Sequence, residues 1–188
     1  MKIAFLDRDG VINKEINYLH KITEFEYTNR CIDGLKNLIR LGYQIVIISN
    51  QAGIAKSIFS EKDYSDLNRW LLADLAAKGI PVLESLYCPH HPDGNHPEYA
   101  VRCKCRKPGT LMLEKVISKY KVDLSQSILI GDKLTDILAG ERAKVGALYL
   151  VSSGHYITPE IRSRYDVQKD LYSVSNIVQS VTAGSMPT

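Results

Sequence analysis

The 188-residue sequence lacks the features that mark membrane, secreted and nucleic-acid-binding proteins. No apolar run approaches the roughly 20 residues of a membrane-spanning helix, and the acidic Asp7 interrupts the first apolar stretch too early for a signal peptide. The charge is nearly balanced, with 24 lysines and arginines against 21 aspartates and glutamates. We therefore expect a cytoplasmic protein with no membrane partner, in which any affinity for anions is local.

Cysteine is also scarce: there are four, and in a reducing compartment they are not expected to form a disulfide framework. Cys31 stands alone in a segment of helical period and is expected to be a small residue on a helix face. The other three lie between residues 88 and 105. The rest of the composition, with 45% hydrophobic and 24% charged residues, is typical of one globular domain with a substantial core.

Short apolar runs of strand length alternate with segments of helical period. The expected strands are 3–6, 45–48, 82–87, 128–130 and 147–151, and the expected helices are 31–41, 61–78, 111–120 and 135–144. The apolar runs are nearly continuous, which indicates strands buried on both faces. This alternation predicts an α/β fold: a three-layer, Rossmann-like parallel sheet with helices on both faces and its chemistry beyond the carboxyl ends of the strands.

The carboxy-terminal part predicts an edge strand near 165–167 and a last helix at 174–181. We expect a single domain over residues 1–182 and a frayed tail at 183–188. One stretch, 88–109, fits neither period and is rich in His, Pro, Gly, Cys and basic residues. A loop of that length inside a compact domain is unusual, so we expect it to be functional or held by something other than packing.

Two pairs of carboxylates follow the first and fourth expected strands. Asp7 and Asp9 would point to the same side of an extended backbone, and Asp132 and Asp136 follow the fourth strand. An isolated Asp-x-Asp would more often be a polar turn at a strand end. Several carboxylates meeting at one sheet edge, however, would repel and raise one another's pKa values. A hard dication with oxygen ligands, Mg²⁺, resolves this conflict.

The second expected strand ends in polar residues. Ser49 and Asn50 offer a hydroxyl, an amide and turn N–H groups that suit phosphate oxygens, although Ser-Asn after a strand is by itself an ordinary turn. A lysine at the same mouth would balance the remaining negative charge. Lys107 and Lys133 are the candidates.

The cysteine-rich stretch offers two close pairs of metal ligands. They are Cys88 with His90 and Cys103 with Cys105, separated by twelve residues. Three thiolates and one imidazole suit tetrahedral Zn²⁺ in a closed structural site, which predicts a zinc-stabilised loop insertion rather than a catalytic zinc. His91 or His96 could replace His90 as the ligand. The alternative is that the cysteines are free thiols that lie near a histidine, in which case no bound metal would order the loop.

Basic residues flank these ligands. Arg102 and Lys104 offset the charge of the thiolates, whereas Arg106 and Lys107 directly follow the last ligand. A bound metal would fix where these two cations point. This placement predicts that they recognise a phosphate or a sugar.

Taken in order, these motifs resemble those of the haloacid dehalogenase (HAD) superfamily of phosphohydrolases. The resemblance covers about residues 1–150 and implies a HAD-like fold, here with no large cap domain. It implies that Asp7 attacks phosphorus to form an aspartyl-phosphate, and that Asp9 protonates the leaving alcohol and later activates water, with a pKa above that of a free aspartate. Mg²⁺ would be held by Asp7, Asp132 and the carbonyl of Asp9, with Asp136 in support.

With the 88–109 loop, the chain further resembles the D-glycero-D-manno-heptose 1,7-bisphosphate 7-phosphatases, which act in heptose nucleotide synthesis for lipopolysaccharide precursors. Residues 7–13, 49–55, 88–107 and 131–133 carry this resemblance. It implies that Ser49 and Lys107 steady the phosphoryl group and that Arg106 recognises the substrate. The further substrate contacts that it implies are Glu15, Asn17, Tyr18, Asn50 and Lys133. The chain departs from the commoner pattern at Lys107-Pro108-Gly109 and at Lys56-Ser57.

We therefore expect a monomeric, Mg²⁺-dependent phosphatase that removes the 7-phosphate from this small phosphorylated sugar, with the α or β anomer left open. Histidinol-phosphate phosphatase, or a phosphatase of another small sugar phosphate, is the alternative; the span of twelve residues between His90 and Cys103 favours the heptose enzyme. A remote alternative is a zinc-loop nucleic-acid module. Against it, the loop has one aromatic residue, Tyr99, and we expect no nucleic-acid partner.

Overall fold

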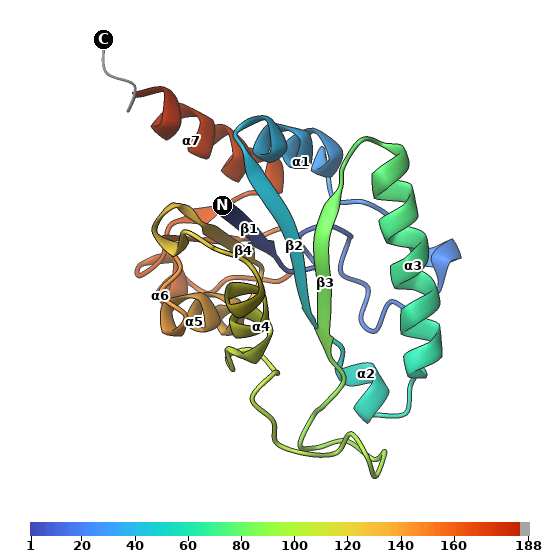
Figure 1. Ribbon diagram of the computed structural model, residues 1–188. Helices are drawn as coiled ribbons and strands as arrows, with labels where there is room; N and C mark the ends of the chain where they lie inside the picture. The colour runs from blue at the N-terminus through green and yellow to red at the C-terminus, as the bar shows by residue number, and fades with distance from the viewer. Residues whose placement is uncertain (185–188) are drawn as a thin grey trace.

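In the computed structural model, which describes residues 1–184 and side chains up to 182, six parallel strands form one sheet in the order β3-β2-β1-β4-β5-β6 (Figure 1). The strands are β1 (Lys2–Leu6), β2 (Tyr43–Asn50), β3 (Val82–Cys88), β4 (Ile128–Gly131), β5 (Ala147–Val151) and β6 (Val167–Gln168). β1 lies between β2 and β4. The carboxyl ends of these three strands therefore meet at one sheet edge, and most of the predicted catalytic and Mg²⁺-binding residues lie at or just beyond these ends.

Helices cover both faces of the sheet. They are α1 (Cys31–Arg40), α2 (Ala52–Ala55), α3 (Glu61–Ala77), α4 (Leu111–Lys119), α5 (Leu134–Arg142), α6 (Pro159–Arg162) and α7 (Leu171–Gly184). Because side chains alternate along a strand, Ala4 and Leu6 of β1 pack with α1, α3 and α7, whereas Ile3 and Phe5 pack with α4 and α5. The predicted three-layer α/β architecture is confirmed.

The carboxy-terminal elements differ from the sequence prediction in their limits. β6 is Val167–Gln168 rather than 165–167, because the N–H of Tyr165 still donates to Ile161 O at the end of α6. α7 begins at Leu171 rather than 174, because the Asp170 carboxylate accepts from Ser173 N at 2.8 Å and caps the helix. The tail expected at 183–188 begins inside α7, and 185–188 lie outside the described residues.

Two long loops leave the carboxyl edge of the sheet, one over residues 7–30 and the other over 88–109. In Figure 1 the second loop extends beyond the sheet beside α2. Within residues 1–184 the first loop holds only the short 3-10 helix Ile22–Glu24, and the second holds neither a helix nor a strand beyond Cys88. None of the helices in this part of the chain is long and apolar enough to cross a bilayer.

Candidate active site

A buried lysine joins the carboxylates that follow β1 and β4. Lys107 Nζ lies 2.9 Å from Asp7 Oδ1 and 2.8 Å from Asp136 Oδ1, and it donates to Ile48 O at 2.7 Å. Burial opposes the charge of this lysine, but Asp136 and Asp7 outweigh burial and raise the pKa of Lys107 above its usual value. Of the two predicted lysines, Lys107 is therefore the fixed cation at the centre of the acidic cluster.

Three carboxylates gather around this position. Asp7, Asp132 and Asp136 offer oxygen atoms within 4.8 Å of one another. Burial, reinforced by the charge of Asp7, raises the pKa of Asp132 to about 9, and burial raises the pKa of Asp7 to about 6 in spite of Lys107. Asp132 Oδ1 is buried and has no hydrogen-bond partner. A buried, unpartnered carboxylate oxygen beside a second carboxylate fits a hard dication such as Mg²⁺.

Asp9 is held by three neighbouring side chains. Arg8 Nη2 donates to its two oxygens at 2.9 and 3.0 Å, and Asn13 and Gln51 each donate from an amide at 2.9 Å. Burial raises the pKa of Asp9, but the Arg8 guanidinium and these hydrogen bonds outweigh burial and lower it. The expectation of a raised pKa is wrong for this arrangement, because the fully buried Arg8 turns back onto its neighbour.

The polar end of β2 lies beside these groups. Ser49 is 1% exposed, and its Oγ accepts from Gln51 Nε2 at 2.6 Å. The amide of Asn50 bonds to the backbone of Lys107. Asn50 thus joins the carboxyl end of β2, which also carries Ser49, to the backbone of Lys107 in the 88–109 loop.

A cavity of about 760 Å³ opens onto this cluster, with Asp9 and Lys107 among its lining residues. All six predicted substrate contacts line it: Glu15, Asn17, Tyr18, Asn50, Arg106 and Lys133. Further cations in the wall are Lys56 and Arg102. The cavity therefore has the positive lining that a second anionic group on a ligand would need.

One wall of the cavity is formed by the loop after β1. Asn17 and Tyr18 both adopt left-handed backbone conformations, with φ of 55° and 58°. Such residues cost about 1–3 kcal/mol each and persist where neighbouring contacts fix them. Here Glu15 Oε1 accepts from Asn17 N at 2.7 Å, and Lys56 Nζ donates to the Tyr18 hydroxyl at 2.9 Å. The loop is therefore held in one shape at the cavity mouth.

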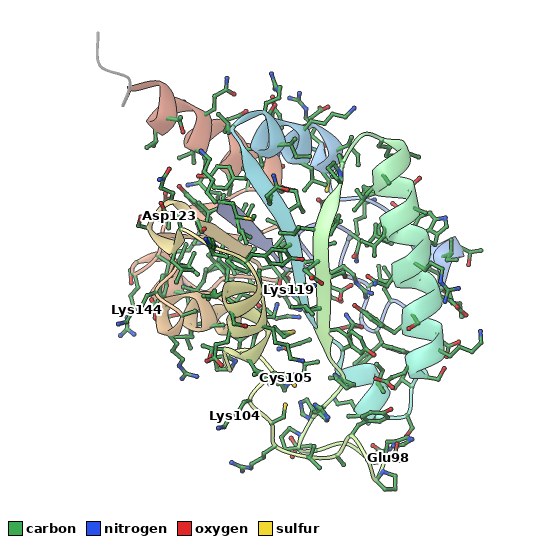
Figure 2. All side chains as sticks on the ribbon, viewed as in Figure 1. Glu98, Lys104, Cys105, Lys119, Asp123 and Lys144 are labelled. Carbon is green, nitrogen blue, oxygen red and sulfur yellow. The ribbon has the colours of Figure 1, made fainter. Side chains whose placement is uncertain are left out.

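The four predicted zinc ligands converge at the base of the 88–109 loop. Cys105 Sγ lies 3.0 Å from Cys88 Sγ and 3.3 Å from Cys103 Sγ, and His90 Nδ1 lies 3.3 Å from Cys105 Sγ. None of these cysteines forms a disulfide. Tetrahedral Zn²⁺ places its sulfur ligands about 3.8 Å apart, so small movements would make this set a zinc site. Figure 2 shows Cys105 at the base of the loop, Glu98 at its far end and Lys104 pointing outward.

The two spare histidines of the loop lie elsewhere. His91 Nδ1 accepts from Asp93 N at 3.1 Å, and His96 Nδ1 accepts from Glu98 N at 3.4 Å. The ring of His96 also packs on Tyr99, with 4.7 Å between the ring centroids. The geometry thus selects His90, rather than His91 or His96, as the fourth member of the cluster.

Comparison with known proteins decides the family. A family model of HAD-hydrolase-like proteins matches residues 104–180. A D-glycero-alpha-D-manno-heptose-1,7-bisphosphate 7-phosphatase of Photorhabdus laumondii is 50% identical over 95% of this chain and 97% of its own length. The chain belongs to this family of HAD phosphatases.

Two further relatives agree with this assignment of the phosphatase. A D-glycero-beta-D-manno-heptose-1,7-bisphosphate 7-phosphatase of Haemophilus influenzae is 42% identical over 85% of this chain and 86% of its own. The crystal structure of D,D-heptose 1.7-bisphosphate phosphatase from B. bronchiseptica, complexed with magnesium and phosphate, has a TM-score of 0.80 and 26% identity. That match covers 96% of this chain and 99% of the other.

Three further residues of the phosphatase contact the predicted site residues and were missed by the sequence analysis. Arg8 and Asn13 hold Asp9, and His155 lines the cavity and contacts Asp132. A signal for His155 was present, because it follows β5 at the same sheet edge as the other site residues. The direction of the Arg8 side chain had no comparable signal in the sequence.

Proposed function

We propose that this phosphatase removes the 7-phosphate from D-glycero-D-manno-heptose 1,7-bisphosphate through an aspartyl-phosphate on Asp7. One observation carries the proposal: a cavity lined by Arg106, Lys133 and Lys56 opens onto the buried group formed by Asp7 and Lys107. A ligand with a phosphate at each end matches a site that has reacting groups at one end and cations along its wall. The names of the two similar relatives support the same substrate.

Asp7 is the group that would attack phosphorus. Its Oδ1 contacts Lys107 Nζ at 2.9 Å and accepts from Arg8 N at 2.8 Å, which leaves Oδ2 as the nucleophilic oxygen. Attack forms an Oδ2–P bond and breaks the bond between phosphorus and the sugar oxygen. Water then attacks phosphorus, which releases inorganic phosphate and restores the carboxylate. Lys107, which lines the cavity, would contact the phosphoryl oxygens during both steps, and Ser49 at the end of β2 would assist it.

Asp9 would give a proton to the leaving sugar oxygen and later take one from the attacking water. For the first step it must be protonated, which the ion pair with Arg8 opposes. A substrate phosphate entering beside Asp9 adds negative charge and raises the pKa of that carboxyl. The substrate itself would therefore prepare Asp9 as an acid, and Arg8 and Gln51 would keep it oriented.

Mg²⁺ would be held by the carboxylates of Asp7 and Asp132 and the carbonyl of Asp9, with Asp136 in support. The unpartnered Asp132 Oδ1 and the raised pKa values of Asp7 and Asp132 support this assignment. When bound, the ion supplies positive charge that offsets repulsion between the attacking carboxylate and the phosphate.

We also propose that Cys88, His90, Cys103 and Cys105 bind a structural Zn²⁺. Support comes from the convergence of all four ligand atoms within 4.8 Å at the base of a loop without helix or strand. Binding of structural zinc contributes on the order of 10 kcal/mol, enough to order such a loop. The ion would fix Arg106, whose backbone N donates to Cys103 Sγ and whose Nη1 donates to His90 O, both at 3.4 Å.

The test is a panel of phosphorylated metabolites at equal concentration, with phosphate release as the measurement. The panel includes both anomers of the heptose bisphosphate, histidinol phosphate and heptose 7-phosphate. We expect the heptose bisphosphate to react fastest and to leave the 1-phosphate in place. We expect the α anomer first, because the 50% identical relative is named for it, whereas the 42% identical one is named for β. A preference for histidinol phosphate would contradict the proposal.

A monomeric state, a cytoplasmic location and the lack of a nucleic-acid partner stay predictions from the sequence. Light scattering coupled to gel filtration tests the first. The ring of Tyr99 supports the third, since it packs on His96 and its hydroxyl donates to Glu61 at 2.7 Å, so it is not presented to stack on a base.

A further inference from the structure

His155 contacts the carboxylate of Asp132 from the cavity side. It follows β5, and its Nδ1 lies within hydrogen-bond distance of Asp132 Oδ2. Its side chain is 37% exposed, whereas that of Asp132 is fully buried. The Ser153 hydroxyl donates to Gly10 O at 2.5 Å and anchors the segment that carries His155 to the loop after β1. The imidazole is therefore held between the buried carboxylate and the substrate cavity.

The two oxygens of Asp132 have different surroundings. The backbone packs closely around Oδ2: a Cβ atom at Gly10 would lie 2.2 Å from it, and a Cβ atom at Gly154 would lie 2.0 Å from it. Side chains other than hydrogen are thus excluded at both glycines. Oδ1, by contrast, is buried without a hydrogen-bond partner. Oδ2 is committed to His155, and Oδ1 is left for a cation.

We propose that His155 is a positioning residue for Mg²⁺ binding, which holds Asp132 so that Oδ1 faces the ion. This inference rests on the Mg²⁺ site of the proposed function. An ionised carboxylate can only accept hydrogen bonds, so in the metal-bound protein Nδ1 must be the donor. A hydrogen bond to one oxygen fixes the rotation of the carboxylate. Partners of this kind typically change metal affinity or activity by about 10- to 100-fold when they are removed.

The other ring nitrogen of His155, Nε2, faces Glu15 in the loop after β1. His155 Nε2 lies 3.8 Å from Glu15 Oε2, which is too far for a hydrogen bond, and the same oxygen lies 3.5 Å from Lys133 Nζ. The contact with Asp132 is thus the directed one. A loss of His155 should act first on Mg²⁺ and only weakly on the substrate.

Three substitutions of His155 separate a hydrogen bond to Asp132 from a contact with the substrate. His155→Asn places an amide donor near the position of Nδ1, His155→Gln places one near Nε2, and His155→Leu removes both. We expect the Leu and Gln variants to bind Mg²⁺ about 10- to 100-fold more weakly and the Asn variant to stay close to wild type. Tyr156→Ala is the matched control, because this neighbour is 82% exposed and does not line the cavity.

Mg²⁺ affinity is measured by calorimetry without substrate, and by the Mg²⁺ concentration that gives half-maximal hydrolysis of p-nitrophenyl phosphate. Neither measurement depends on the identity of the sugar substrate. Wild-type affinity in His155→Leu, or equal loss in all three variants, would overturn the positioning role. A higher KM for the heptose bisphosphate with unchanged Mg²⁺ affinity would also overturn it, because His155 would then contact the substrate. If the proposed function is wrong, the wild-type enzyme will hydrolyse the heptose bisphosphate slowly, and this result is independent of Mg²⁺ affinity.

Discussion

The side-chain amide of Asn50 forms hydrogen bonds with both the backbone N–H and the backbone C=O of Lys107. Asn50 Nδ2 donates to Lys107 O at 3.1 Å, and Asn50 Oδ1 accepts from Lys107 N at 3.0 Å. Asn50 ends β2, whereas Lys107 belongs to the 88–109 loop. Because Lys107 Nζ contacts Asp7 and Asp136 from this fixed backbone, the amide joins the loop to the reacting groups.

Asn50→Ala should therefore lower turnover. The variant loses two hydrogen bonds, each worth about 0.5–1.5 kcal/mol, so we expect a loss of about 5- to 150-fold in kcat/KM. The loss should be similar for the heptose bisphosphate and p-nitrophenyl phosphate, because Lys107 serves the transferred phosphoryl group in both. Asn95→Ala, at an exposed position of the same loop, is the control. A loss confined to the sugar substrate would mean that Asn50 acts only as a substrate contact.

Asp7→Asn should lower turnover by several orders of magnitude, because the amide keeps the shape of the side chain and removes the attacking charge. The fold should survive. Burial raises the pKa of Asp7 to about 6, so its charged form is disfavoured in the fold and a neutral group is tolerated. Single-turnover assays and thermal unfolding in a chelator measure the two effects. Asp33→Asn, at an exposed position on α1, should keep wild-type activity; substantial activity in a folded Asp7→Asn protein would disprove the nucleophile.

Removal of Mg²⁺ by a mild chelator should stop turnover without disturbing the fold. Oxygen ligands bind Mg²⁺ weakly enough for exchange, whereas the proposed sulfur and nitrogen site of the 88–109 loop would retain Zn²⁺. Added Mg²⁺ should restore activity while the zinc content and the circular dichroism spectrum stay constant. Turnover that continues after complete removal of Mg²⁺ would contradict the assignment of Asp132 as a metal ligand.

Cys105→Ser should reduce the zinc content towards zero and loosen the 88–109 loop. Cys105 Sγ contacts both other sulfurs of the cluster, so this substitution breaks the set at its centre. Metal analysis and limited proteolysis measure the loss and the loosening. Cys31→Ala serves as the matched control, since Cys31 lies outside the cluster and should leave one zinc per chain. Purified wild-type protein without zinc would refute the proposed site.

Arg106→Ala should impair the heptose bisphosphate far more than p-nitrophenyl phosphate. A charged hydrogen bond contributes about 1.5–3 kcal/mol, which corresponds to roughly 10- to 150-fold in kcat/KM. Arg106 lines the cavity, whereas Lys107 contacts Asp7 directly, so Lys107→Ala should damage both substrates. Lys104→Ala, at an exposed position, should change neither. Equal losses on both substrates in Arg106→Ala would show that Arg106 serves the chemistry or the loop instead.

The sequence by itself determined the α/β architecture and where most of the candidate site residues lie in it. Apolar runs and helical periods are local patterns, so they predicted the parallel sheet. Because the carboxyl ends of parallel strands meet at one edge, this prediction placed Asp7, Ser49 and Asp132 at neighbouring strand ends. The spacing of the cysteines likewise predicted the cluster at the base of the 88–109 loop. It favoured His90 as the fourth ligand but left His91 and His96 as possible replacements, because all three lie in one irregular segment.

Only the tertiary structure decided how the site residues contact one another. The direction of Arg8, which reverses the expected pKa shift of Asp9, depends on a buried space that no local pattern describes. The contact between His155 and Asp132 joins residues 23 positions apart. Periodicity encodes which face of an element is buried, whereas side-chain contacts between loops depend on how the packed elements bring those loops together.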